Sequence, residues 1–197
     1  MLLPPRENHM SFNDFFGLEP EDKELEKCKN TALRYITAQV KSEGQIADYL
    51  KRKGFLENHI KDTIQYLRDY NYVDDRMYCV MYYKEAARKG KGRRRIEQEL
   101  LNKKISKSAI RDALDEFVSE ENPEYQEMIE DVGSESERAL AVGRKMLSQH
   151  LELGKPADKN FMAKVGRRLM SLGYDSSILY SVIGTLMKEG KTSDDDY

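Results

Sequence analysis

An internal repeat constrains the fold of this chain more than any other feature of its sequence. Apolar residues recur without gaps at an offset of 50 residues, which takes Leu50 to Leu100, and at an offset of 119, which takes it to Leu169. The three matching sets are Ile46, Leu50, Phe55, Ile60, Ile64 and Leu67; Ile96, Leu100, Ile105, Ile110, Leu114 and Phe117; and Val165, Leu169, Tyr174, Leu179, Ile183 and Leu186. Recurrence of one apolar pattern is typical of repeat proteins, whose stacked helical units form extended surfaces for large partners.

Composition narrows the class further. The chain has 197 residues, of which 39% are hydrophobic and 35% charged, and it has no Trp, which favours a soluble helical protein. No apolar run reaches the roughly 20 residues that span a bilayer, and the N-terminus lacks the apolar core of a secretory signal. Cys28 and Cys79 lie far apart outside any metal-binding pattern. We therefore expect reduced thiols, no cofactor and a cytoplasmic location without membrane contact.

The repeat and the turn residues predict six segments in an all-α chain. These are a flexible N-terminal arm (1–24), three-helix repeat 1 (25–73), repeat 2 (74–117), an acidic linker (118–134), repeat 3 (135–188) and a disordered tail (189–197). A small group of apolar residues would anchor the arm: Phe12, Phe15, Phe16 and Leu18. Each repeat is close to the lower size limit for an independent core, so neighbouring repeats must stack. We expect an elongated, curved arrangement of helix-turn-helix-like units and a monomer.

Local signals place the turns of the first two repeats. The first helix of repeat 1 carries an apolar stripe formed by Leu33, Ile36 and Val40. Ser42 and Gln45 have the spacing of a capping box, and Gly54 suits the left-handed position after a helix. In repeat 2, Lys104 stands where repeat 1 has this glycine, and Asp74 and Asp75 are candidate N-caps.

Catalytic and metal sites are poorly supported. Neighbouring residues on a helix do not converge on one ion, so we read the two aspartates as caps. His59 and His150 lack partners at ligand spacing, and we expect surface or helix-end roles for both. The segment Gly90-Lys91-Gly92 lacks the spacing of a phosphate-binding loop. We predict that the chain is not an enzyme.

Charge is strongly segregated along the chain, although the net charge is only −2. Residues 84–111 contain eleven Lys and Arg against three Glu, a net +8, and residues 112–137 contain eleven acids and no Lys or Arg. The candidate binding residues are Lys84, Arg88, Lys89, Lys91, Arg93, Arg94, Arg95, Lys103 and Lys104, which we call the basic segment. With only three acids nearby, we expect it to be poorly neutralised and to bind an acidic partner, with at least one of Tyr78, Tyr82 and Tyr83 exposed beside it.

The acidic residues that follow suggest a second role for the linker. A flexible tether would hold them at high effective concentration beside the basic segment, so we predict an intramolecular contact that weakens as salt rises. The alternative is that the acids only keep a spacer extended and soluble.

The motifs resemble those of the RecX family, regulators of the bacterial RecA recombinase. The resemblance covers residues 26–115 and is carried by Ala32-Leu33-Arg34-Tyr35-Ile36, Ser42-Glu43, Leu50-Lys51-Arg52-Lys53-Gly54, Tyr72-Val73-Asp74-Asp75-Arg76-Met77-Tyr78 and Lys89-Gly90-Lys91-Gly92-Arg93-Arg94-Arg95-Ile96-Glu97-Gln98-Glu99-Leu100. Arg93 stands where the family often has Pro, and Lys104 where it has Gly.

The resemblance implies a fold of tandem three-helix repeats and a role in DNA repair and recombination. It implies insertion along the groove of the RecA–DNA filament, with loss of recombinase and coprotease activity. Within the basic segment, we assign this role to Arg88, Lys91, Arg93, Arg94 and Arg95. Weak binding to single- or double-stranded DNA is compatible with it, since near-neutral net charge supplies few phosphate contacts. Two alternatives remain: a helix-turn-helix-like DNA-binding protein acting independently of RecA, and a helical scaffold of the HEAT type.

Overall fold

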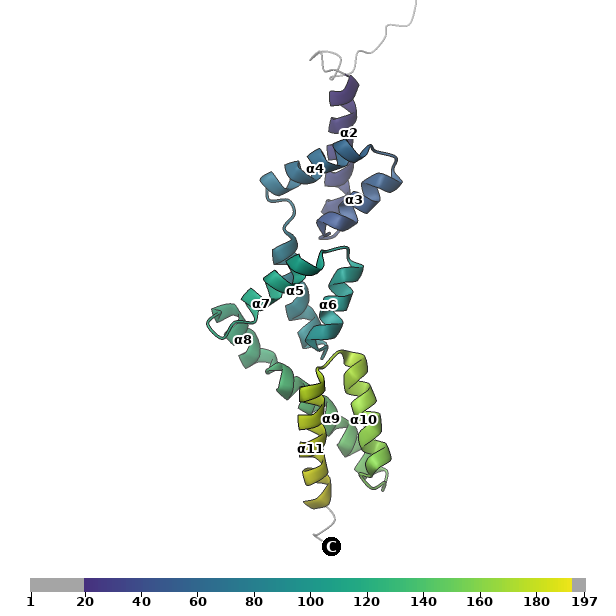
Figure 1. Cartoon of the computed structure of the whole chain (residues 1–197), viewed down its shortest axis with the longest axis vertical. Helices are drawn as coiled ribbons and strands as arrows, with labels where there is room; N and C mark the ends of the chain where they lie inside the picture. The colour runs from purple at the N-terminus through teal and green to yellow at the C-terminus, as the bar shows by residue number, and fades with distance from the viewer. Residues whose placement is uncertain (1–19, 193–197) are drawn as a thin grey trace, which may run out of the picture. The chain divides into compact units, whose positions relative to one another are not determined.

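The computed structural model describes residues 20–192, which are helical throughout apart from turns and short connections (Figure 1). The helices are α2 (Pro20–Thr37), α3 (Glu43–Arg52), α4 (Glu57–Asp69), α5 (Asp75–Arg88), α6 (Arg93–Asn102), α7 (Lys107–Phe117), α8 (Pro123–Val132), α9 (Glu135–Glu152), α10 (Lys159–Leu172) and α11 (Ser176–Thr192). The chain divides into two compact units between Asp74 and Asp75. The all-helical prediction is confirmed for the described residues.

The first unit contains repeat 1, formed by α2, α3 and α4. Ser42 and Gln45 form the predicted capping box at the start of α3, and Gly54 has the predicted left-handed conformation, with φ of 89°. The buried core consists of Cys28, Ala32, Ile46, Leu50, Ile60, Leu67 and Val73. Val40 does not belong to the apolar stripe, because α2 ends at Thr37 and the Val40 side chain is 60% exposed. Helix α2 also begins at Pro20, within the segment predicted as a flexible arm; the apolar anchor residues of that arm lie outside the described residues.

Repeat 2, in the second unit, follows the same plan with α5, α6 and α7. Ser106 accepts a hydrogen bond from the amide of Ala109 and so caps α7. Ile96, Leu100 and Leu114 are fully buried, as the repeat predicts. Lys104 takes the place of Gly54 with φ of 68°, a left-handed conformation that costs a non-glycine residue about 1–2 kcal/mol.

The segment predicted as an acidic linker contains a folded helix. Asn122 caps α8 by accepting from the amide of Glu124, and Pro123 occupies the first turn, where its missing N–H is not needed. Tyr125 and Met128, at i and i+3, are buried in the core of repeat 2. The prediction of a flexible tether is therefore wrong for residues 123–132, because two apolar side chains of this helix pack into the core of repeat 2.

Repeat 3 is formed by α9, α10 and α11. A capping box at Ser134 and Glu137 starts α9, and Gly173, with φ of 85°, ends α10 at the predicted turn. The predicted positions Val165, Leu169, Tyr174, Leu179 and Leu186 are all buried. Because α11 continues to Thr192, the prediction of a disordered tail is wrong for residues 189–192.

Candidate partner-binding surface

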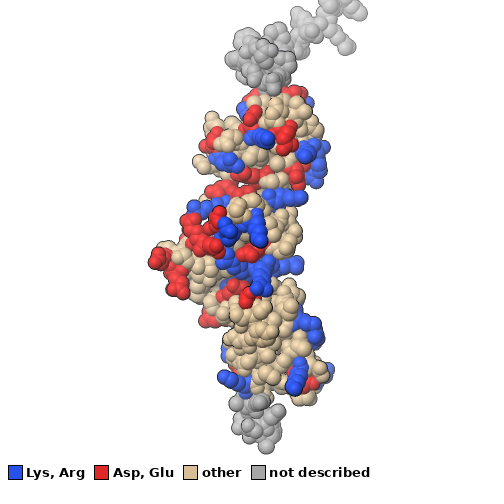
Figure 2. Space-filling model, viewed as in Figure 1, with Lys and Arg blue, Asp and Glu red and all other residues tan. Residues whose placement is uncertain are grey.

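The basic segment spans three pieces of repeat 2. Lys84 and Arg88 lie in the last turns of α5, Lys89 and Lys91 in the connection, and Arg93, Arg94 and Arg95 in the first turn of α6. Lys103 and Lys104 follow the end of α6. Figure 2 shows Lys and Arg intermixed with Asp and Glu over this repeat, rather than a continuous basic face.

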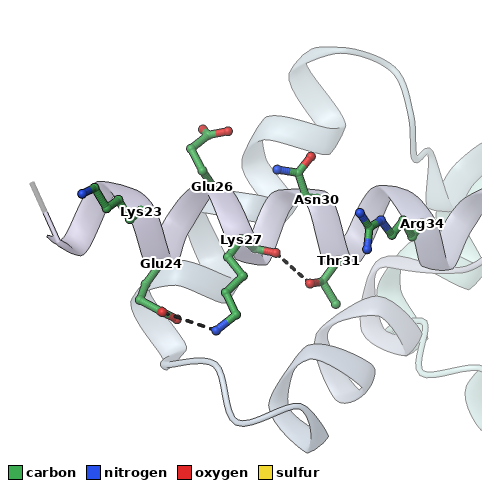
Figure 3. A pocket seen from close by; sticks show the side chains of 7 residues that line it. All are labelled: Lys23, Glu24, Glu26, Lys27, Asn30, Thr31 and Arg34. Atoms are coloured by element: carbon green, nitrogen blue, oxygen red, sulfur yellow. Dashed lines mark hydrogen bonds and ion pairs between the residues drawn. The ribbon is translucent and has the colours of Figure 1, made fainter. Parts of the chain in front are cut away.

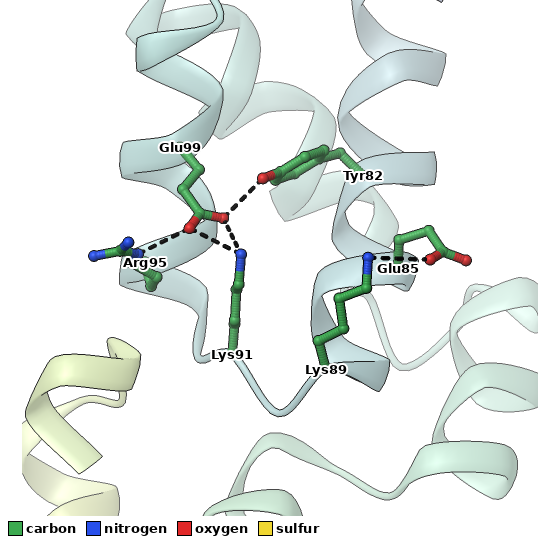
Figure 4. A network of polar contacts seen from close by, with 6 residues as sticks. All are labelled: Tyr82, Glu85, Lys89, Lys91, Arg95 and Glu99. Carbon is green, nitrogen blue, oxygen red and sulfur yellow. Dashed lines mark hydrogen bonds and ion pairs between the residues drawn. The ribbon is translucent and has the colours of Figure 1, made fainter. Parts of the chain in front are cut away.

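Glu99 is the centre of a polar network (Figure 4). Its carboxylate accepts hydrogen bonds from Lys91 Nζ at 2.7 and 2.9 Å, from Arg95 Nε at 2.9 Å and from the Tyr82 hydroxyl at 2.8 Å. The network joins α5, the following connection and α6, so it fixes the connection between the two helices. Its single carboxylate is also the shared anionic partner of two cations of the basic segment.

The network shifts the pKa values of two of its members, Glu99 and Tyr82. Burial would raise the pKa of Glu99, but the hydrogen bonds from Lys91, Tyr82 and Arg95 lower it to about 2. Burial and the bond to the Glu99 carboxylate raise the pKa of Tyr82 to about 12. Glu99 is therefore ionised and Tyr82 neutral across the physiological range.

Arg93 and Arg94 also have intramolecular partners. Arg93 donates to Glu97 at 2.8 Å and to Asp115 on α7, and its backbone amide donates to Glu135 on α9 at 2.8 Å. Arg94 donates to Asp175, which lies just before α11. These arginines therefore help to join repeat 2 to repeat 3.

Helix α8 neutralises the end of α5. Lys84 donates to Glu124 at 2.6 Å and Arg88 to Asp131 at 3.3 Å. Glu85 lies 3.8 Å from Lys89. The expectation of a poorly neutralised segment is therefore wrong, because acids outside residues 84–111 add to the three local ones and pair with Lys84, Arg88, Arg93 and Arg94. The predicted contact between acidic and basic segments does exist, but a docked helix makes it.

The three tyrosines of α5 differ in exposure. Tyr83 is buried, whereas Tyr78 and Tyr82 are partly exposed with near-parallel rings whose centroids are 6.4 Å apart. Lys103 Nζ lies 5.0 Å from the Tyr82 centroid and 5.9 Å from that of Tyr78. At these distances the cation is attracted to the ring faces.

Residues of repeat 3 contact the glycine-containing connection before α6. The amide of Gly92 donates to the carbonyl of Leu172 at 2.8 Å, and the Tyr174 hydroxyl donates to the carbonyl of Gly90 at 2.9 Å. These contacts give the two glycines a structural role.

A second group of cations, on α10, was not predicted from the sequence. Helix α10 carries Lys159, Lys164, Arg167 and Arg168 and no acidic residue. All four are exposed, and none forms an ion pair with another described residue. The signal was present as a basic helix without acids, but the larger charge run in residues 84–111 obscured it.

The remaining candidates have structural explanations. Asp74 immediately precedes α5, as a cap should. His59 lies in the first turn of α4, which fits the helix-end alternative, and its side chain is buried rather than at the surface. The His150 ring stacks on Phe161 with centroids 4.1 Å apart. No cluster of three metal-binding side chains, and no helix able to cross a membrane, occurs within the described residues.

A further hollow lies on the exposed side of α2 in the first unit (Figure 3). It is lined by Lys23, Glu24, Glu26, Lys27, Asn30, Thr31 and Arg34, all from this one helix. Lys27 pairs with Glu24 at 3.4 Å, and its carbonyl accepts from the Thr31 hydroxyl at 2.7 Å. A surface formed by one helix and both signs of charge does not define a ligand.

Comparison with known proteins identifies the repeats. The model described as the first three-helix domain of RecX matches residues 28–67, and that of the second matches residues 74–114. The regulatory protein RecX of Clostridium perfringens strain 13 is 31% identical over 167 residues, which cover 84% of this chain and 71% of the relative. RecX of Clostridium botulinum strain Eklund 17B is 31% identical over 159 residues, covering 80% and 67%.

Solved structures share the fold. The crystal structure of RecX from Lactobacillus salivarius matches with a TM-score of 0.68 at 20% identity, covering 84% of this chain and 97% of that one. A second crystal structure of a regulatory protein RecX matches with a TM-score of 0.64 at 23% identity, covering 89% and 78%. The fold therefore agrees with the sequence relatives, and the 31% identity to RecX of Clostridium perfringens shows that the chain belongs to the RecX family of regulatory proteins.

Proposed function

We propose that this RecX protein is a non-enzymatic modulator, chiefly an inhibitor, of the RecA recombinase, and that it binds along the groove of the RecA–DNA filament. Membership of the RecX family carries the proposal. The two family domains coincide with repeats 1 and 2, and the basic segment lies in the second of them. We infer that the protein acts as a cytoplasmic monomer.

The exposed members of the basic segment are the proposed contacts. The side chains of Lys89, Arg94 and Arg95 are 69%, 63% and 53% exposed, although each has an acidic neighbour. A surface ion pair contributes at most about 1 kcal/mol, so an acidic partner can replace such a neighbour at little cost. Arg93 is less suitable, since it contacts α7 and α9.

The test measures RecA-dependent ATP hydrolysis and strand exchange on single-stranded DNA. We expect inhibition at substoichiometric amounts of the protein. Combined Lys89→Ala and Arg95→Ala substitutions should weaken inhibition several-fold, because the partner loses two charges. Lys107→Ala with Arg111→Ala is the matched control, since both cations are exposed on α7 of the same repeat but lie outside the basic segment.

Co-sedimentation separates the proposal from its alternative. Binding to pre-formed RecA filaments should exceed binding to naked DNA. Tight binding to naked DNA with no effect on RecA would instead favour the independent DNA-binding protein. Equal inhibition by the wild type and the Lys89→Ala, Arg95→Ala variant would exclude these two cations from the interface.

A further inference from the structure

Repeat 3 contains a hollow between the second half of α9 and the helix α10, with a volume of about 330 Å³. We propose that this hollow binds a peptide segment of a partner protein in which carboxylates flank a bulky apolar side chain. The site lies outside the basic segment and does not depend on the proposed action on RecA.

The floor of the hollow is apolar and held in place. Phe161 belongs to the core of repeat 3, and Met146 packs against that core. The His150 ring stacks on Phe161, and its Nε2 lies 3.1 Å from the carbonyl oxygen of Pro156, which fixes this part of the wall. Leu153 lies at the edge with 69% of its surface exposed. An apolar side chain of a partner would bury Leu153 and gain the usual free energy of removing apolar surface from water.

Two cations line the same hollow. Lys164 and Arg168 are four residues apart on α10 and therefore project from the same side of the helix. Neither forms an ion pair with another described residue, and no Asp or Glu lines the hollow. The basic segment differs, since Lys91 and Arg95 already share the Glu99 carboxylate. The cations of the hollow are thus available for carboxylates, and an arginine can bind one with two parallel hydrogen bonds.

An apolar floor with two cations favours a peptide ligand over a nucleic acid. Affinity for a nucleic acid grows with the number of phosphate contacts, and only two Lys or Arg side chains line this hollow. Single-stranded nucleic acid is held by exposed aromatic faces on which bases stack. Here the Phe161 ring is buried and one face of the His150 ring is already stacked on it, whereas the exposed Leu153 supplies aliphatic surface. An apolar side chain between carboxylates matches both the floor and the cations.

The experiment uses the full chain and a fluorescein-labelled, end-capped peptide of sequence Glu-Glu-Leu-Phe-Glu-Glu. We expect fluorescence anisotropy to show saturable binding that Arg168→Glu weakens about tenfold, because it places a carboxylate against those of the peptide. Arg167→Glu is the matched control, since this neighbouring exposed arginine lies outside the hollow, and it should change affinity less than about twofold.

A second pair of measurements tests the contact between Leu153 and the apolar side chains of the peptide. Leu153→Ser should weaken binding about fivefold, and a peptide with Gly-Gly in place of Leu-Phe should bind equally weakly to the wild type and to this variant. Unchanged circular dichroism and thermal melts would show that the variants fold. Equal losses with Arg167→Glu and Arg168→Glu, or no saturable binding, would overturn the proposal. Tighter binding of a 15-nucleotide oligo-dT that is lost specifically with Arg168→Glu would replace it with a nucleic-acid site.

Discussion

Gly92 lies against Gly173 so closely that it has no room for a side chain. A Cβ atom on Gly92 would lie 2.6 Å from the carbonyl carbon and oxygen of Gly173, and one on Gly173 would overlap the Cβ and backbone nitrogen of Arg95. The amide of Arg94 also donates to the carbonyl of Gly173 at 3.2 Å. Backbone contacts therefore join the start of α6 to the end of α10 within the second unit.

Gly92→Ala should accordingly destabilise the second unit. The added methyl group meets backbone atoms, which cannot rotate away, so we expect a loss of about 2–3 kcal/mol in the free energy of unfolding. Urea denaturation followed by circular dichroism measures it. Gly184→Ala is the control, since a Cβ there meets nothing within 4 Å in the middle of α11, and it should stabilise by about 0.5–1 kcal/mol. A neutral Gly92→Ala would show that the two backbones are not held at this distance.

Glu99→Gln should change how stability depends on pH. The pKa of Glu99 is lowered in the folded state to about 2 from an ordinary value near 4.5. The stabilisation from its ionised form is therefore fully present above about pH 4.5 and lost as the pH falls toward about 2. The variant should lose about 1–2 kcal/mol at pH 7 and show a shallower decline in this acid range.

Thermal melts from pH 7 to pH 2 provide the measurement. Glu127→Gln is the matched control, because this exposed residue on α8 forms no ion pair with another described residue. It should follow the wild type throughout. A Glu99→Gln profile parallel to that of the wild type below pH 4.5 would contradict the assigned pKa.

The helical repeat could be predicted because its signals are local and periodic. Ile46, Ile96 and Val165 occupy equivalent positions, and all three are fully buried. Helix caps depend on a few neighbouring residues, which is why the Ser42–Gln45 box could be read from the sequence. The same locality explains the recognition of the RecX motifs.

The long-range charge pairs could not be predicted, since their partners are distant in the chain. Arg94 pairs with Asp175 across 81 residues, and Lys84 with Glu124 across 40. Residues 84–111 contain only three acids, so the other partners of these cations cannot be recognised from the neighbouring sequence. Helix α8 was missed because its buried residues Tyr125 and Met128 are outnumbered by acids.

Lys104→Gly should stabilise repeat 2. Lys104 has a positive φ at the turn where repeat 1 has Gly54, and glycine adopts this conformation without a steric penalty. We expect a gain of about 1 kcal/mol, measured by urea denaturation. Asn71→Gly, at the other non-glycine position of positive φ in the described chain, should give a smaller gain because asparagine tolerates this conformation better. Destabilisation by Lys104→Gly would mean that contacts of the lysine side chain outweigh its backbone strain.

Removing the two α8 carboxylates that contact the basic segment should strengthen its binding to an acidic partner. Glu124 pairs with Lys84 and Asp131 with Arg88, and hydrogen bonding by Lys84 lowers the pKa of Glu124, so this carboxylate is charged near neutrality. Glu124→Gln combined with Asp131→Asn leaves both cations for the partner. We expect affinity for RecA filaments, or for heparin as a polyanion probe, to rise about two- to fivefold at low salt.

The control substitutes Glu127→Gln and Glu130→Gln, which remove the same charge from exposed positions of α8 that form no ion pair with other described residues. A general electrostatic effect would raise affinity equally in both variants, whereas direct competition raises it more in the first. The difference should shrink at about 0.5 M salt, because exposed pairs are then screened over a few ångströms. If the two variants bind equally at every salt concentration, α8 contributes only its overall charge and the contacts with Lys84 and Arg88 do not compete with a partner.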